Sequence, residues 1–272
     1  MPKKMKFSVV LPIYINVELK TFRKSLQSIL NQTLKPNEII LILDGPIKHE
    51  IKKFILKKKK TYKSIKIITF SKNHGLGYVL NKAIKSCKYN IIARCDADDF
   101  SNKKRFQTQI NFFKKNKKVD VLGCNIKEVN NSKIISKKFM VKEDHKIKKQ
   151  LLFRNPINHS SVMFKKNKVL NSGNYQQIQY FEDYYMWFAM AKNNCIFQNL
   201  PSFLVSMSVD DDFYIRRSGL KYYKYYLNFI LKVRKKFKVS ILIILFNIIL
   251  RLPLIFLHYK FIKILYSFIL RN

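Results

Sequence analysis

The pattern of hydrophobic positions in the first part of the chain alternates between continuous apolar runs and helical spacing. Phe7–Tyr14 and Glu38–Asp44 are apolar runs typical of strands buried on both faces. Pro12 is expected to stop the first strand, because proline cannot donate a hydrogen bond to a central ladder. Residues 17–31 carry apolar side chains three and four positions apart, which predicts a helix with one apolar face. This β–α–β order predicts an α/β fold whose mostly parallel sheet is flanked by helices.

The same alternation continues along the chain. It predicts helices at 47–60, from the turn Asn73–Gly77 through Ile84, and at 103–116, and strands at Ile65–Phe70, Tyr89–Arg94 and Val119–Gly123. Residues 124–150 are polar and poorly periodic, so they are expected to form an irregular excursion. Asn158–Phe164 is expected to be a strand that opens with a histidine, and an apolar helix is expected to begin at Glu182.

Polar side chains stand at the carboxyl ends of the first four predicted strands. In open α/β sheets, ligands bind outside the carboxyl ends of the strands. We therefore expect a single crevice to collect these side chains. They are Tyr14, Asp44, Asn73, Asp96, Asp98 and Asp99.

The last three of these residues form an acidic cluster in a basic chain, which has 16 Asp and Glu against 54 Lys and Arg. Neighbouring carboxylates repel one another, so a fold tolerates them mainly where a cation compensates their charge. Asp96 and Asp98, two positions apart, suit a divalent metal, Mn²⁺ or Mg²⁺, or a ribose contact. A metal held there would neutralise a departing nucleoside diphosphate as a Lewis acid.

The net charge of +38 bears on possible partners. Such a field attracts nucleic acid or an anionic membrane, although a compositional bias toward Lys, Asn, Ile, Phe and Tyr would give the same charge. A nucleic-acid-binding protein would interleave basic and aromatic side chains on one face. Here the Lys runs fall on helix exteriors and the predicted crevice is acidic, so no specific nucleic acid partner is expected.

The compartment expected from the sequence is the cytoplasm. The four cysteines, at positions 87, 95, 124 and 195, have neither zinc-site nor disulfide spacing, which is typical of a reducing environment. The apolar run that follows the basic N-terminus ends at Pro12 and is too short for a signal peptide.

The composition changes after Asp212. Residues 213–272 contain no acidic residue and thirteen Lys and Arg, a pattern typical of a surface that faces anionic lipid. The apolar stretches on either side of Pro253 are each shorter than the roughly 20 residues that a membrane-spanning helix needs. We expect a pair of helices that lie on the membrane and are hinged at Pro253, with a span or a soluble packing helix as alternatives.

The transfer of a group to an acceptor by direct displacement also needs a base for the acceptor hydroxyl. Asp183, which begins the predicted apolar helix beside Glu182, is the leading candidate, and His159 is the second. Two simpler interpretations compete with these assignments. Acidic residues at a helix start are stabilised by the helix dipole, and a single histidine beside a strand is usually structural.

The ordered set of motifs resembles the family 2 glycosyltransferases with the GT-A fold, over residues 6 to about 212. The motifs are Val9–Tyr14, Ser28–Thr33, Glu38–Gly45, Asn73–Gly75, Asn81–Ile84, Asp96–Asp99, Arg105–Phe106, His159–Phe164 and Glu182–Tyr184. The resemblance implies a GT-A domain at residues 1–212, followed by a basic helical tail at residues 213–272. It also implies inverting transfer from a nucleotide-sugar, commonly a UDP-sugar.

The resemblance implies roles for particular residues. It places the donor nucleotide at Pro12, Tyr14, Asp44, Asn73 and Asp96. It makes Asp96 and Asp98 the DxD pair at ribose and metal, and Asp183 the catalytic base. Asp99, His159 and Glu182 are further candidates for the site.

Several departures from the family's motifs narrow this hypothesis, and two other enzyme classes are disfavoured. Ile15 follows Tyr14 where the family often has Asn, and Asp44 stands alone where many members have two Asp. The Gln-x-x-Arg-Trp motif of processive synthases is absent, which favours addition of one hexose or N-acetylhexosamine to a lipid-linked, lipopolysaccharide or capsule-type glycan at the inner face of the bacterial membrane. An Asp-nucleophile phosphatase is disfavoured by Phe100, and a dinucleotide-binding enzyme by Leu80.

Overall fold

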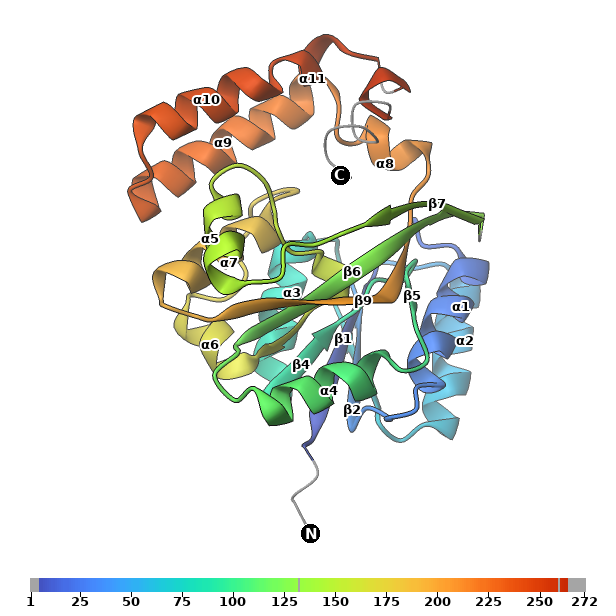
Figure 1. The fold of residues 1–272 in the computed structure, drawn as a ribbon. Helices are drawn as coiled ribbons and strands as arrows, with labels where there is room; N and C mark the ends of the chain where they lie inside the picture. Colours follow the sequence, from blue (N-terminus) through green and yellow to red (C-terminus); the bar gives the residue numbers. More distant parts are fainter. Residues whose placement is uncertain (1–4, 132, 259, 264–272) are drawn as a thin grey trace.

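The structure, a computed structural model, describes residues 5–131, 133–258 and 260–263. Within these residues a nine-stranded sheet runs through the molecule between helical layers (Figure 1). Its strands are β1 (Phe7–Ile13), β2 (Glu38–Leu43), β3 (Ile65–Thr69), β4 (Ile91–Arg94), β5 (Phe100–Ser101), β6 (Val121–Asn130), β7 (Lys133–Lys138), β8 (Met163–Lys165) and β9 (Phe197–Ser208).

The strand order places a topological switch point between β1 and β4. The order is β3–β2–β1–β4–β8–β6–β9–β5, and β7 pairs with β6. Strands β1 to β4 are mutually parallel, whereas β8 runs antiparallel to β4 and β6, and β9 is parallel to β6. The chain leaves β1 toward β3 and returns on the other side of β1 with β4. The carboxyl ends of β1 and β4 therefore meet where open α/β sheets bind ligands.

Strand β1 continues through Pro12, which corrects the expectation that this residue stops the strand. Pro12 pairs with Ile42 of β2, and the strand ends at Ile13. On the other side, the last bond runs from the Cys95 amide to the Val10 carbonyl, just past the end of β4. Alternate residues of a strand face the same neighbour, so the missing N–H of Pro12 faces the side on which β4 has ended.

Helices cover both faces of the sheet, as the sequence predicts. Val9 and Leu11 of β1 pack with α1, α2 and α4, and Val10 faces the opposite core with α3, α7 and α9. The helices are α1 (Leu19–Leu30), α2 (His49–Thr61), α3 (Leu76–Ser86), α4 (Arg105–Lys115), α5 (Asp144–Leu151), α6 (Lys166–Asn171), α7 (Glu182–Lys192), α8 (Asp211–Ile215), α9 (Gly219–Phe237), α10 (Ile241–Arg251) and α11 (Pro253–Phe256), with a 3₁₀ helix at His159–Ser161.

The segment 124–150 is regular, contrary to the expectation of an irregular excursion. β6 runs on to Asn130, β7 pairs with it as an additional strand, and α5 follows. The side chains of β7 are mostly exposed, which explains why the sequence shows no apolar alternation there. The predicted strand Asn158–Phe164 is instead a 3₁₀ turn followed by the short strand β8, and the long strand β9 was not among the predicted elements.

The C-terminal helices pack against the α/β part of the molecule. Tyr226, Phe229 and Val233 of α9 lie in the same buried cluster as residues of α7. Asn247 of α10 donates a hydrogen bond to the Leu152 carbonyl at 2.8 Å. None of the described helices is both long and apolar enough to cross a membrane.

The predicted break in the tail is confirmed at Pro253, which begins α11 directly after α10 and Leu252. Residues 264–272, the last part of the predicted second helix, lie outside the described residues. The domain boundary at residue 212 stays a prediction.

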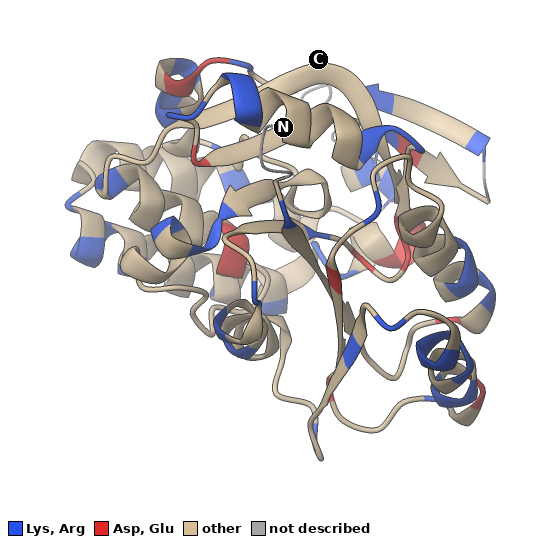
Figure 2. Ribbon diagram, turned by 90° about the horizontal axis from the view of Figure 1, so that it is seen from below, with Lys and Arg blue, Asp and Glu red and all other residues tan. Residues whose placement is uncertain are grey.

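Charged residues are distributed unevenly over the fold (Figure 2). Lys and Arg lie on many helices and loops, whereas Asp and Glu are confined to a few segments. On α2, for example, Lys52, Lys53 and Lys57 are exposed while Ile51 and Ile55 are buried. The four cysteines are buried and free, in agreement with the prediction of no disulfides.

Candidate functional site

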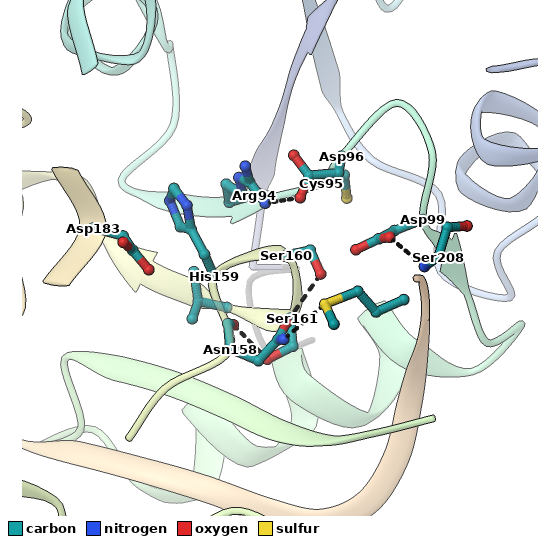
Figure 3. Close-up of polar contacts among 12 residues, drawn as sticks. Arg94, Cys95, Asp96, Asp99, Asn158, His159, Ser160, Ser161, Asp183 and Ser208 are labelled. Atoms are coloured by element: carbon teal, nitrogen blue, oxygen red, sulfur yellow. Dashed lines mark hydrogen bonds and ion pairs between the residues drawn. The ribbon is translucent and has the colours of Figure 1, made fainter. Parts of the chain in front are cut away.

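The candidate site lies at the switch point, where the acidic loop after β4 faces the start of α7. Asp96 follows β4, and its carboxylate forms an ion pair with the buried guanidinium of Arg94 (Figure 3). The Asp96 carbonyl accepts a hydrogen bond from Ser25 Oγ on α1 at 2.7 Å. This loop is therefore held by the strand before it and by the first helix.

The rest of the acidic loop is tied to the end of β9. The Ser208 amide donates to Asp99 Oδ1 at 2.9 Å, and Ser208 Oγ donates to the Asp98 carbonyl at 2.5 Å. Asp99 is buried, and desolvation followed by the charges of Asp98 and Asp96 raises its pKa well above the usual range. Its contacts make Asp99 an anchor of the loop in this structure.

Asp98 differs from Asp99 because its side chain reaches solvent. Protein atoms still crowd it from the sides, and this desolvation together with the charge of Asp96 raises the pKa of Asp98 to about 6. A bound cation would relieve this repulsion. Among the described residues no cluster of three or more His, Cys, Asp and Glu side chains surrounds a common point. Asp96 and Asp98 supply two carboxylates, the number that a divalent ion bound mainly by phosphate oxygens and water uses.

Asp44, at the end of β2, is buried and bonded to the turn before α3. Its two carboxylate oxygens accept from the amides of His74 at 2.7 Å and Gly75 at 3.1 Å. The Asn73 side chain is exposed, and its amide nitrogen lies 3.4 Å from the Asp44 carbonyl. Next to Asp44, Gly45 has a φ of +82°, and a Cβ there would lie 2.6 Å from the backbone nitrogen of Asn73. The turn is therefore packed against the end of β2 as closely as glycine allows.

The end of β1 contributes an aromatic ring. Tyr14 follows the strand directly and is 37% exposed, so a ligand at this edge of the sheet can reach it. Pro12 lies two residues earlier and is buried. Tyr14, Asp44 and Asp96 therefore all stand at the carboxyl ends of neighbouring parallel strands.

Asp183 lies in the first turn of α7 and is partly buried. Its Oδ2 accepts a hydrogen bond from the Asn155 side-chain amide at 2.8 Å. Desolvation raises the pKa of Asp183, while the hydrogen bond from Asn155 and, more weakly, the charge of Arg94 lower it. The side-chain hydrogen-bond partner of this carboxylate is therefore a neutral amide.

Glu182, the neighbour of Asp183, is buried. Desolvation, with a smaller contribution from the charge of Asp183, raises its pKa to about 7. Phe181 is the N-cap of α7 and its side chain forms no capping bond. Both carboxylates nevertheless lie where the helix dipole favours negative charge.

His159 lies between the two acidic groups in Figure 3. Its Nε2 is 2.7 Å from the hydroxyl of the buried Tyr175. Desolvation and the charge of Arg94 hold the pKa of His159 well below its usual range, so the imidazole is neutral near pH 7. The structure therefore places His159 in the site, in contact with a side chain that also packs in the core.

Three polar residues of the site were not among the sequence-predicted candidates. Arg94 ends β4, and a charge that closes an apolar run is itself a signal of a special environment. Asn155 and Ser208 lie in segments that carry no motif, and only the folded chain brings them to Asp183 and Asp99.

Comparisons with known proteins agree on the class of molecule. A sequence profile described as Glycosyl transferase family 2 matches residues 8–175. The chain is 34% identical over 220 residues to the Escherichia coli protein named UDP-Gal:alpha-D-GlcNAc-diphosphoundecaprenol beta-1,3-galactosyltransferase, and the match covers 80% of this chain and 79% of that protein.

Two solved structures show the fold. Residues 1–349 of TarS from S. aureus, in complex with UDP-GlcNAc, match with a TM-score of 0.68 at 17% identity, over 97% of this chain and 73% of that one. This chain spans 40% of the longer TarS chain. The mannosyltransferase PcManGT from Pyrobaculum calidifontis, in complex with GDP-Man and Mn²⁺, matches with a TM-score of 0.66 at 14% identity, over 91% and 70% of the two chains. The expected GT-A fold is confirmed by these likenesses.

Proposed function

Because the chain belongs to glycosyl transferase family 2, we propose that it transfers one sugar from a UDP-sugar to a lipid-linked glycan acceptor, with inversion at the anomeric carbon. The sugar is a hexose or an N-acetylhexosamine, and the acceptor is a precursor of a bacterial surface polysaccharide. The donor class is supported by the UDP-sugars in the names of the E. coli relative and of the TarS complex. The acceptor class is supported by the diphosphoundecaprenol in the name of the relative.

The observation that carries the proposal is the opposition of Asp183 to the acidic loop across Arg94 (Figure 3). In a single displacement, the acceptor oxygen forms a bond to the anomeric carbon as the bond from that carbon to the β-phosphate oxygen breaks. The electron pair of the broken bond leaves with UDP, and the acceptor proton passes to the Asp183 carboxylate. One base and one leaving group on opposite sides of the sugar produce inversion.

The donor binds on the β-strand side of the site in this proposal. Tyr14 stacks on the base, while Asp44 and Asn73 hold the nucleoside at the turn before α3. Asp96 and Asp98 would hold a divalent metal, Mn²⁺ or Mg²⁺, which would supply Lewis-acid stabilisation of the departing diphosphate. Asp99 keeps the loop in place through Ser208.

A donor and acceptor assay tests this function. The purified full chain is titrated with UDP-galactose and UDP-N-acetylglucosamine in Mn²⁺ and again in EDTA, and then assayed with a synthetic GlcNAc-diphosphate lipid. We expect metal-dependent binding of at least one donor and a product whose anomeric configuration, read by NMR, is opposite to that of the donor. Failure of both donors to bind in the presence of metal would reject the proposed UDP-sugar specificity, and retention of configuration would reject the single displacement.

We further propose that the C-terminal helices attach the enzyme to the inner face of the membrane. Large apolar side chains of α10 and α11 are exposed although the opposite side of α10 packs on the protein. They are Leu242, Leu245, Phe246, Ile249, Leu250 and Phe256. The end of α9 adjoins them with the basic residues Arg234, Lys235 and Lys236. An apolar face bordered by cations fits the surface of an anionic bilayer.

Vesicle flotation tests this attachment. The full chain should float with vesicles that contain phosphatidylglycerol and float less with pure phosphatidylcholine. Ile249→Asp should reduce flotation about tenfold, because a charge on the apolar face is costly in the bilayer interface. Leu56→Asp on α2, 47% exposed in the native protein, is the matched control and should float like the native chain. Equal flotation of all three proteins would contradict the assignment of this face.

A further inference from the structure

Arg94 is a buried cation with few partners. It is 3% exposed and lies at the end of β4, in the middle of the candidate site (Figure 3). Within the described residues, its guanidinium donates to one acceptor, the carboxylate of Asp96. Its Nε is shielded from solvent and has no hydrogen-bond partner. A guanidinium has five N–H donors, so most of its hydrogen-bonding capacity is unused.

Arg105, 1% exposed, shows what a structural buried arginine looks like in the same protein. Its Nε donates to Gln109 at 3.2 Å, its Nη1 to Ser101 at 3.0 Å, and its Nη2 to the Arg94 carbonyl at 2.8 Å. All three of its nitrogens are therefore bonded. Burying a charged group without such bonds is costly, so a fold that needed only a structural cation at Arg94 would have bonded it in the same way.

The position of Arg94 indicates which part of a ligand would meet its unused donors. In Figure 3 its guanidinium lies between Asp96 of the acidic loop and Asp183 at the start of α7. In a displacement, the transferred sugar must lie between the leaving diphosphate and the base. A guanidinium between those two carboxylate groups therefore faces the sugar, whose hydroxyl oxygens are acceptors that match N–H donors.

We propose that Arg94 is a substrate-binding residue that donates hydrogen bonds to hydroxyl oxygens of the transferred sugar while its other edge stays paired with Asp96. This inference rests on the proposed function. Arg94 then contacts the sugar, whereas Tyr14 and Asp44 contact the nucleotide. A contact with the diphosphate instead would affect UDP and UDP-sugar alike, and this difference is what the experiment measures.

The test compares dissociation constants by calorimetry in Mn²⁺ for UDP, UDP-galactose and UDP-N-acetylglucosamine. Arg94→Lys keeps a positive charge beside Asp96 but loses the planar fork of donors. We expect it to weaken the better UDP-sugar about 10- to 100-fold and UDP less than threefold, since a hydrogen bond from a charged donor is lost only with the sugar. Arg23→Lys, on the exposed face of α1, is the matched control and should change neither constant.

The outcomes separate the two proposals. Equal weakening of UDP and UDP-sugar, or no weakening of either, overturns the assignment of Arg94 and leaves the proposed function standing. Failure of the native protein to bind any UDP-sugar overturns both.

A measurement on the native protein covers the case in which the Arg94 variant does not fold. Arginine Nε–H resonances of the ¹⁵N-labelled full chain are recorded with Mg²⁺ alone, with UDP, and with each UDP-sugar. The Arg105 Nε–H, bonded to Gln109, serves as a constant reference. We expect one further protected Nε–H resonance to shift with UDP-sugar and not with UDP. Identical spectra in the two nucleotide states would overturn the inference.

Discussion

The two acidic groups of the site, Asp96 after β4 and Asp183 on α7, differ in the side chains that pair with their carboxylates. Asp96 is paired with a buried arginine, and the loop that carries it is tied down by Ser25 and Ser208. Asp183 begins a helix, and its side chain receives a hydrogen bond from the neutral amide of Asn155. One carboxylate is thus paired with a cation on a loop that is held in place, whereas the other has a pKa raised by desolvation.

This difference matches two separate tasks. A carboxylate on a firmly held loop suits a cation and a donor, because its position does not change during the reaction. A desolvated carboxylate with a neutral partner suits proton transfer, because its basicity is greater than that of a solvated one. The comparison predicts that substitutions on the two sides separate binding from turnover.

The largest effect on turnover is expected at Asp183. Asp183→Asn removes the proton acceptor and should lower kcat by about 10³-fold. Donor affinity, measured by calorimetry, should change less than twofold, because the donor binds on the other side of the site. Glu50→Gln on the exposed face of α2 is the control. A parallel loss of donor affinity would mean that Asp183 acts in binding or folding.

A smaller loss, roughly 100-fold in turnover, is expected for Asp98→Asn, because the metal contribution to leaving-group stabilisation is lost. In this variant the affinity for UDP should fall in Mn²⁺ but match that of the native protein in EDTA. Manganese binding followed by electron paramagnetic resonance gives a readout independent of turnover. Unchanged Mn²⁺ affinity would remove Asp98 from the metal site.

A pH-dependent effect is expected at Asn155. Its hydrogen bond lowers the pKa of Asp183, so Asn155→Ala should raise that pKa. Asp183 must be ionised to accept a proton, and the acidic limb of the kcat profile should therefore move to higher pH. We expect about a tenfold loss at the acidic end and little loss at the alkaline end. Asn111→Ala on α4 is the control, and an unshifted limb would show that Asn155 does not act through Asp183.

The smallest effect on turnover, less than threefold, is expected for Glu182→Gln, but its stability should change with pH. The folded-state pKa of Glu182, about 7, exceeds its usual value of 4.5. Folding therefore carries no penalty from Glu182 below pH 4.5 and an increasing penalty as the pH rises to 7. In urea unfolding at pH 8, the variant should be more stable than the native chain by roughly 2–3 kcal/mol. A 100-fold loss of turnover instead would make Glu182 the base.

The sequence was sufficient for the parallel half of the molecule. The strands that end near Tyr14, Asp44 and Arg94 are continuous apolar runs because both of their faces are buried, and α1 shows one apolar face because it covers one side of the sheet. In successive β–α–β units the strands are parallel, so their order in the chain places all their carboxyl ends at one edge of the sheet. The positions of Tyr14, Asp44 and Arg94 at one edge of the sheet could therefore be predicted from the sequence.

The other half depends on pairings between distant segments. β9 contains Pro201 and irregular register with β6, so it shows neither a clean alternation nor an apolar run. β7 is polar because its side chains are exposed. The lack of a hydrogen-bond partner at Arg94 Nε could not be predicted either. It depends on which distant segments fold around Arg94, and His159 and Asp183 are more than sixty positions away in the chain.

The bonds from Ser208 to the acidic loop also set an order of assembly. They join residues 109 and 110 positions apart, across most of the α/β domain. During synthesis, β1 to β4 leave the ribosome well before β9, and contacts of such separation form late in folding. The acidic loop therefore acquires its bonds to β9 only after residue 208 has been synthesised. A nascent chain that ends before Ser208 carries Asp96, Asp98 and Asp99 without the strand end that holds their loop.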